Sequence, residues 1–134
     1  MKALLLFLSA VGLYGQVVVI GPASLPMDRL TLSEIQHLYM GKTATIRGVD
    51  LTPKDNGEGT LFKEFCQEVL GKSTHQIRAY WSRMIFTGQK SPPPQTTTAR
   101  LKEERTLRPP VITYVRPGQV LEGWKILYEA EPAP

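Results

Sequence analysis

Short apolar runs rich in β-branched and aromatic residues alternate along this chain with segments of helical periodicity. Residues 17–20 and 111–115 are such runs, and they favour strands that are buried in a sheet. Residues 124–128 place apolar side chains at alternate positions, and residues 45–51 do so more weakly, which predicts two further strands. We therefore expect one domain of the α/β or mixed α+β class, with a sheet covered by helices.

Helix signals fill the stretches between these runs. Thr31 with Glu34, and Ser73 with Gln76, form two capping boxes, in which the two side chains satisfy free backbone N–H groups at a helix start. A further helix is predicted over residues 61–70, from apolar residues on one face. The helix after Ser73 carries the strongest periodicity, at i, i+3, i+4, i+7 and i+8: Ile77, Tyr80, Trp81, Met84 and Ile85. We expect this stripe to lie in the core.

The N-terminus has the pattern of a secretory signal peptide. Lys2 precedes the uncharged apolar run of residues 3–13. That run is shorter than the roughly 20 residues of a membrane span, although an uncleaved anchor is the alternative interpretation. We predict a signal peptide over residues 1–15, a domain over 16–129 and a loose tail over 130–134. The predicted location is the periplasm.

Charge and cysteine content narrow the set of partners. The formal net charge is +4 and falls to +3 when Lys2 is removed with the signal peptide. This value does not single out a polyanion, and export argues against a nucleic-acid partner. Cys66 is the only cysteine, so an internal disulfide cannot form. We expect a protein that is not embedded in the membrane.

Residues with catalytic or metal-binding chemistry are scattered along the sequence. His37 and His75 stand in different segments, and neither has a second histidine or a cysteine at ligand spacing. Cys66 falls on the apolar face of its predicted helix, which favours an inert, buried thiol. The motifs of nucleophilic hydrolases, zinc proteases and nucleotide-binding loops are missing from the sequence. We therefore predict no enzyme activity, no metal site and no cofactor.

The most informative local motif is the loop KDNGEGT, over residues 54–60, which leads directly into a predicted helix. Free backbone N–H groups at a helix start, together with the helix dipole, commonly bind anions. Glu58 places a carboxylate inside this loop, and an ordinary polar turn that caps a helix is the competing interpretation. The candidate ligand-binding residues are Lys54, Asn56, Gly57, Glu58, Gly59 and Thr60.

The runs LTLSEIQHLYMGK and VDLTPKDNGEGTLFKEFCQEVLGKSTHQIRAYWSRMIFTGQKSPP resemble small single-domain relatives of the phosphate-binding protein of ABC importers. The most specific stretch covers residues 69–88, and the whole resemblance covers about residues 17–94. It continues more weakly through VITYV and WKIL. The resemblance implies a single lobe like those of periplasmic binding proteins, with a mixed sheet of about four strands between helices.

The resemblance also implies roles for the loop residues. The family loop resembles R-x-D-G-S-G-T, and Gly57, Gly59 and Thr60 match it. Lys54 stands in place of the arginine, and Asn56 in place of the aspartate. Glu58 replaces a serine that could donate a hydrogen bond to a phosphate oxygen, whereas a carboxylate only accepts and repels. Two like charges about 4 Å apart repel by roughly 4 kcal/mol at an effective dielectric of 20, which weakens binding about a thousandfold.

Two hypotheses follow from these features. In the first, a periplasmic protein similar to the binding components of phosphate ABC importers holds phosphate or another small oxyanion weakly, and an ABC permease is its partner. Weak binding is expected because one lobe leaves the ligand open to water, whereas two lobes close around it. In the second, the chain is an envelope scaffold or adaptor that keeps the lobe fold and binds another protein. The proline-rich segment over residues 91–94 would then be a natural contact surface.

Overall fold

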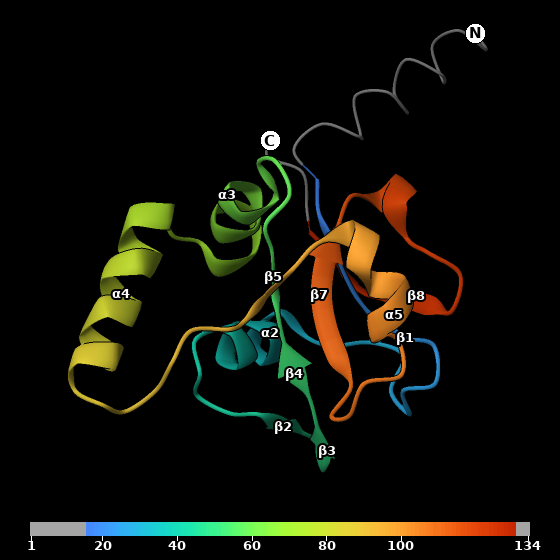
Figure 1. Cartoon of the computed structure of the whole chain (residues 1–134), viewed down its shortest axis with the longest axis horizontal. Helices are drawn as coiled ribbons and strands as arrows, with labels where there is room; N and C mark the ends of the chain where they lie inside the picture. The colour runs from blue at the N-terminus through green and yellow to red at the C-terminus, as the bar shows by residue number, and fades with distance from the viewer. Residues whose placement is uncertain (1–15, 131–134) are drawn as a thin grey trace, which may run out of the picture.

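The computed structural model describes residues 16–130, which form a mixed four-stranded sheet with helices on its faces (Figure 1). The strands of this sheet are β1 (Val18–Pro22), β4 (Thr52–Pro53), β7 (Val111–Val115) and β8 (Trp124–Glu129). Their order is β4-β7-β1-β8. Strand β4 is parallel to β7, and β1 is antiparallel to both β7 and β8. The predicted class, α/β with a mixed sheet of about four strands flanked by helices, is confirmed.

The helical segments begin and end largely where their caps predict. Both capping boxes are present: the Thr31 hydroxyl accepts a hydrogen bond from the Glu34 N–H, and the Ser73 hydroxyl accepts one from the Gln76 N–H, each over 3.1 Å. The predicted helix over residues 61–70 is an α-helix that continues into a π-helical turn. The segments are α2 (Leu32–Tyr39), α3 (Leu61–Phe65), the π-helical turn η1 (Cys66–Leu70), α4 (Thr74–Phe86) and α5 (Leu101–Glu104).

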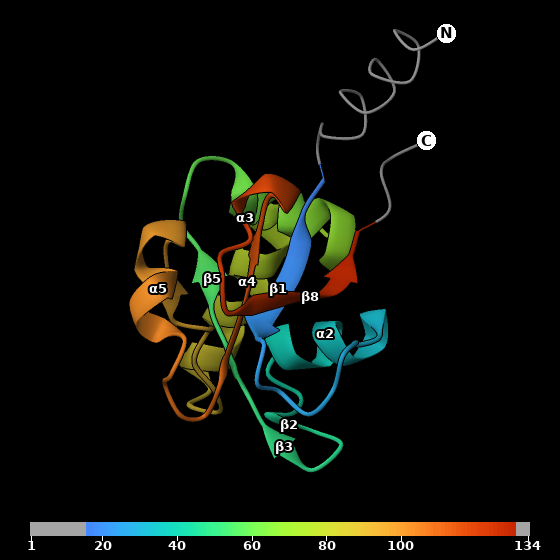
Figure 2. The same ribbon diagram turned by 90° about the vertical axis from the view of Figure 1, so that its right-hand side faces the viewer.

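The two central strands are buried on both faces, as expected for strands covered by helices on either side. Side chains alternate along β1, so Val19 points into one core and Val18 into the other. The larger core includes the buried faces of α2, α3 and η1, and the smaller core includes Leu101 of α5. Figure 2 shows α2 and α5 on opposite sides of the sheet.

The predicted single strand over residues 45–51 is wrong. Those residues form a small antiparallel hairpin of β2 (Thr45–Ile46) and β3 (Val49–Asp50), which is separate from the main sheet. The reversal lies at Arg47 and Gly48, whose φ angles are 49° and 82°. Positive φ at two successive positions produces a tight hairpin turn, and a glycine makes the second of them inexpensive.

The predicted apolar stripe of α4 is only partly buried. Ile77 and Trp81 are 3% and 6% exposed, and Tyr80 and Met84 pack partly against the larger core. Ile85 is 55% exposed, so its predicted core position is wrong. In Figure 1, α4 lies at the left, apart from the strands of the main sheet. The neighbouring Phe86 is 93% exposed.

The remaining segments connect the sheet to the candidate site. Strands β5 (Asp55–Asn56) and β6 (Gln95–Thr96) form a two-stranded parallel pair, which joins the segment after β4 to the loop that follows α4.

The predicted boundaries of the domain stay predictions: residues 1–15 and 131–134 lie outside the described part. Within it, Ala130 is buried and its N–H donates to the Val17 carbonyl over 3.1 Å. Between residues 16 and 130, none of the helices is both long and apolar enough to cross a membrane. Besides β5 and β6, the short connecting elements are the 3-10 turns η2 (Thr98–Arg100) and η3 (Pro117–Gln119).

Candidate functional site

The loop from Gly57 to Thr60 joins β5 to α3, and part of its backbone is already hydrogen bonded. The Gly57 N–H donates to the Thr96 carbonyl over 3.0 Å, which fixes the start of the loop on β6. The Glu58 N–H donates to the Asn56 side-chain oxygen over 3.0 Å. By contrast, the N–H groups of Gly59 and Thr60 have no acceptor among residues 16–130. The predicted anion cradle therefore has two free backbone donors.

The Asn56 side chain anchors the loop through hydrogen bonds. It is fully buried, and its amide nitrogen donates to the Tyr114 carbonyl and to the Thr98 hydroxyl, each over 3.0 Å. With the Glu58 N–H on its oxygen, this side chain joins β5, β7 and η2. The predicted site residue Asn56 thus positions the loop and offers no hydrogen atom to a ligand.

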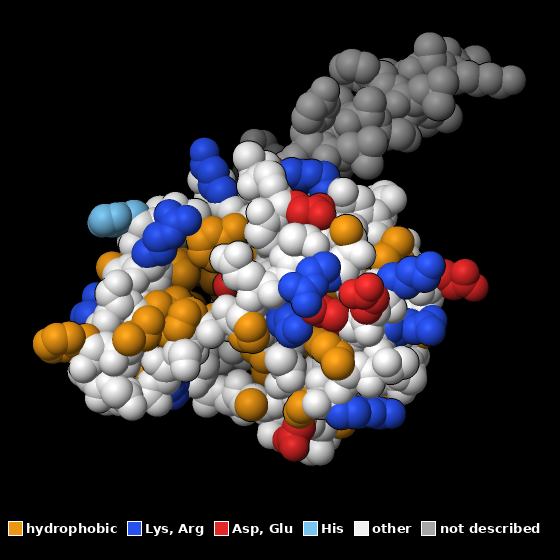
Figure 3. All heavy atoms as spheres, in the orientation of Figure 1, with side chains coloured by type: hydrophobic (Ala, Val, Ile, Leu, Met, Phe, Trp, Pro, Cys, Tyr) orange, Lys and Arg blue, Asp and Glu red, His pale blue; other side chains and the backbone are white. Residues whose placement is uncertain are grey.

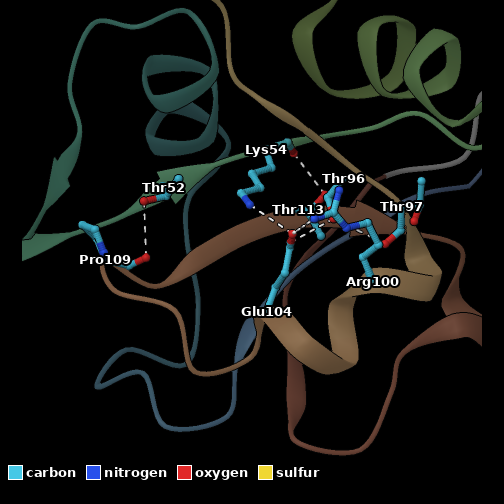
Figure 4. A network of polar contacts seen from close by, with 8 residues as sticks. All are labelled: Thr52, Lys54, Thr96, Thr97, Arg100, Glu104, Pro109 and Thr113. Atoms are coloured by element: carbon cyan, nitrogen blue, oxygen red, sulfur yellow. Dashed lines mark hydrogen bonds and ion pairs between the residues drawn. The ribbon is translucent and has the colours of Figure 1, made fainter.

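Lys54 directly precedes β5 and forms an ion pair with Glu104. Its ammonium group lies 3.1 Å from a carboxylate oxygen of Glu104 on α5, and the two side chains are 14% and 7% exposed (Figure 4). The Thr96 hydroxyl donates to the other Glu104 oxygen over 2.8 Å. Arg100 is more distant, at 3.9 Å from Glu104. Lys54 was expected to attract an anion with its positive charge. Its charge instead interacts with the buried carboxylate of Glu104.

The Thr60 hydroxyl is hydrogen bonded to both members of a second ion pair, which the sequence did not indicate. The two terminal guanidinium nitrogens of Arg116 donate to Glu64, over 2.6 and 2.7 Å, in a two-pronged geometry. The Thr60 hydroxyl donates to Glu64 over 2.5 Å and accepts from Arg116 over 3.1 Å. Hydrogen bonds from Arg116 lower the pKa of Glu64, and those same bonds raise the pKa of Arg116. The hydroxyl that the resemblance assigned to ligand binding is satisfied within the protein.

Arg116 could have been found only from its position at the end of β7. It follows a fully buried strand in the part of the chain where the resemblance is weak. Its partner Glu64 is 52 residues away, and the sequence offers no spacing rule for a pair so far apart. Because Arg116 neutralises Glu64, that carboxylate repels an anion near Thr60 less than a free one would.

Gly59 and Thr60 border a groove of about 1070 Å³ between α4 and the β5–α3 segment, which we call the α4 groove. Gly57, Gly59 and Thr60 line its polar end, and Glu58 is not among its lining residues. Its walls are mainly apolar, and Figure 3 shows hydrophobic side chains gathered around the hollow beside α4. The apolar lining comes chiefly from Phe62, Ile77, Trp81, Ile85 and the prolines at residues 92–94.

Charged groups of both signs line the α4 groove. Arg78 and Lys63 bring positive charge, and the Arg78 guanidinium lies 5.5 Å from the centre of the Phe62 ring. Asp55 brings a carboxylate, which accepts a hydrogen bond from the Tyr114 hydroxyl over 2.9 Å. Burial raises the pKa of Asp55 to about 6, although the bond from Tyr114 opposes this shift. The negative charge in the groove therefore depends on pH in the mildly acidic range.

This arrangement is suited to binding. Two backbone donors, two cations and one titrating acid surround an apolar groove. Cys66 is buried as predicted, and burial raises the pKa of its thiol to about 12, so little thiolate forms at neutral pH. Across residues 16–130, His, Cys, Asp and Glu side chains form no group of three or more that could hold a metal ion.

Comparisons with known proteins give little sequence support for a family. No protein-family model matches the chain, and no curated protein matches it. Among solved structures, the chain is similar to the crystal structure of an ABC-type phosphate transport receptor from Vibrio cholerae, at 9% sequence identity and a TM-score of 0.49. The alignment covers 83% of this chain and 44% of that receptor. The chain thus spans less than half of the receptor's length.

Proposed function

We propose that the chain is an exported binding protein that holds a small oxyanion, such as phosphate, at the polar end of the α4 groove. The observation that carries this proposal is the pair of N–H groups on Gly59 and Thr60, which lack acceptors among the described residues and border the groove. Lys63 and Arg78 line the same groove and attract a negative ligand. The resemblance of the loop to that of phosphate-binding proteins supports the same ligand class.

The expected affinity is low. Hydrogen bonds to a charged group contribute about 1.5–3 kcal/mol each, so two backbone donors supply roughly 3–6 kcal/mol before other terms. A Kd of 1 mM corresponds to about 4 kcal/mol, which places binding in the millimolar range. Two groups that were expected to bind the anion already have partners: Lys54 is paired with Glu104, and the Thr60 hydroxyl donates to Glu64. Tight capture therefore calls for a second protein surface, and the resemblance makes an ABC permease the first partner to test.

A titration followed by NMR tests the proposal at the level of single amides. Sulfate, which keeps its charge between mildly acidic and neutral pH, is added to isotope-labelled protein at low salt. We expect the amide signals of Gly59 and Thr60 to shift most, with a millimolar midpoint. Arg78→Glu should weaken the response, whereas Lys102→Glu, the same charge change outside the groove, should leave it intact. Static signals at Gly59 and Thr60, with larger shifts elsewhere, would contradict the proposal.

The second candidate function is an envelope adaptor that binds another protein through the α4 groove. The mainly apolar wall and the exposed side chain of Ile85 favour it, because an open apolar groove gains more from burying a protein segment than from holding an oxyanion. Photo-crosslinking in intact cells tests this function. A crosslinking residue at position 85 should give a discrete product that the same residue at position 102 does not give. Equal products at both positions would count against the adaptor.

A further inference from the structure

A second groove lies on α4, between this helix and the end of α2, and we call it the basic groove. Its volume is about 790 Å³. The end of α2 contributes His37, the turn after α2 contributes Lys42, the turn between η1 and α4 contributes Lys72, and α4 contributes His75 and Arg83. The α4 groove is lined by a different set of residues, so the two grooves are separate surfaces.

Apart from the phenol of Tyr80, every ionisable side chain that lines the basic groove is basic. Lys42, Lys72 and Arg83 carry positive charge, and neither Asp nor Glu lines the groove. Among residues 16–130, these three cations make no ion pair with a carboxylate. Five other cations, including Lys54 and Arg116, do have such partners. An all-positive groove without internal counter-charges is complementary to an acidic partner.

The spread of these charges argues for an extended partner. His75 and Arg83 are eight positions apart on α4, which corresponds to about 12 Å along a helix at 1.5 Å per residue. Cationic side chains spread over this length can each meet a different carboxylate of an extended acidic chain.

Part of the lining of the groove is apolar, and hydrogen bonds join the elements that form the groove. Met40 and Leu70 line it and are 8% and 7% exposed. The Tyr80 hydroxyl donates to the Met40 carbonyl over 2.7 Å and ties α4 to the end of α2. The Gln36 side chain donates to the Val69 carbonyl over 2.9 Å and ties α2 to η1. A groove lined by basic side chains together with Met40 and Leu70 matches a segment in which acidic and apolar side chains are mixed.

We propose that the basic groove is the docking site for an acidic peptide segment of a partner protein, whose carboxylates meet Lys72 and Arg83 and whose apolar side chains lie on Met40 and Leu70. This inference does not depend on oxyanion binding at Gly59 and Thr60, because no residue lines both grooves. A failure of one proposal therefore leaves the other standing.

Fluorescence anisotropy with a defined probe tests the docking site. The probe is a labelled peptide in which glutamates and leucines are mixed, and the matched peptide carries glutamine in place of glutamate. We expect the wild-type protein to bind the acidic peptide and not the glutamine peptide. Binding should weaken as salt rises, because exposed charges are screened over a Debye length of about 8 Å at physiological ionic strength.

Two double variants locate the binding surface. Lys72→Glu with Arg83→Glu should weaken binding of the acidic peptide by roughly tenfold, since two attractive exposed pairs become repulsive. Arg29→Glu with Lys102→Glu makes the same change in net charge outside both grooves and should leave binding within about twofold of wild type. Circular dichroism spectra should show that both variants keep the fold.

Three results would overturn the proposal. The wild-type protein could fail to bind the acidic peptide at low salt. The two double variants could lose affinity equally, which would reduce the effect to net charge alone. Vesicles of phosphatidylglycerol could bind with dependence on Lys72 and Arg83 while the peptide does not, which would assign the groove to a membrane surface instead.

Discussion

Replacing Asp55 by asparagine should stabilise the protein at neutral pH. Asp55 lines the α4 groove, and burial raises the pKa of its carboxyl from 3.8 to about 6. The folded protein therefore binds the proton more tightly than the unfolded chain does. Stability from this group is fully present below about pH 4 and is lost as pH rises through about 6. Asparagine cannot ionise, and its carbonyl oxygen can still accept the hydrogen bond from Tyr114.

The size of the effect follows from the same shift. A change from 3.8 to about 6 is about 2.2 pKa units, and each unit corresponds to 1.36 kcal/mol. The effect is therefore at most about 3 kcal/mol at neutral pH. Below about pH 4 the wild type and Asp55→Asn should be equally stable, because the carboxyl is then neutral in both the folded and the unfolded state.

Urea unfolding followed by tryptophan fluorescence measures this difference from about pH 4 to about pH 7. Asp28→Asn is the control, since the Asp28 side chain is 91% exposed and its ion pair with Lys125 is at the surface. The expected result is a gap between wild type and Asp55→Asn that opens with rising pH, and no such gap for Asp28→Asn. A gap that is constant with pH, or an Asp55→Asn variant less stable than wild type at neutral pH, would refute the argument.

Three further predictions test the core, the buried ion pair and the loop. Trp81→Ala should lower the free energy of unfolding by about 3 kcal/mol, because the ring is 6% exposed in the larger core; an unchanged melting temperature would contradict this. Lys54→Met should lower it by about 3 kcal/mol by leaving Glu104 buried without its partner, and Lys54→Met with Glu104→Leu should recover much of the loss in urea unfolding. Glu58→Ser should raise the affinity for sulfate by up to about fivefold in the NMR titration, far less than a thousandfold, because Glu58 does not line the groove; no change would show that its charge is not felt by the ligand.

The sequence predicts those features of the fold that depend on neighbouring residues. The capping boxes at Thr31 and Ser73 form as their spacing indicates, since each joins groups only three residues apart. Strand β7 is recognisable because all five of its residues are apolar or β-branched and buried. Strand β4 is not recognisable, because it has two residues, one of them a proline, and exists only through its pairing with β7. Pairing of that kind depends on residues distant in sequence.

The same division explains the outcome at the candidate site. The loop at residues 57–60 was visible as a glycine-rich entry to a helix, and the structure does place Gly59 and Thr60 on a groove. What each polar side chain does was not visible. Lys54 and Glu104 are 50 residues apart, and Arg116 and Glu64 are 52 residues apart. A local pattern identifies which backbone groups are free, whereas only the folded chain determines which side chains are already paired.

Charge placement on α4 links the two proposed surfaces and suggests how they could act together. The helix presents Arg78 to the apolar groove that contains the free amides, and His75 and Arg83 to the basic groove on its other side. Its contact with the rest of the protein depends mainly on Ile77 and Trp81, which are buried, and on the Tyr80 hydroxyl bonded to Met40. A partner in the basic groove would contact Tyr80 and Arg83, two residues of α4. Because α4 is also one wall of the other groove, a partner that preferred one position of the helix would change oxyanion affinity, and the oxyanion would change partner affinity by the same factor.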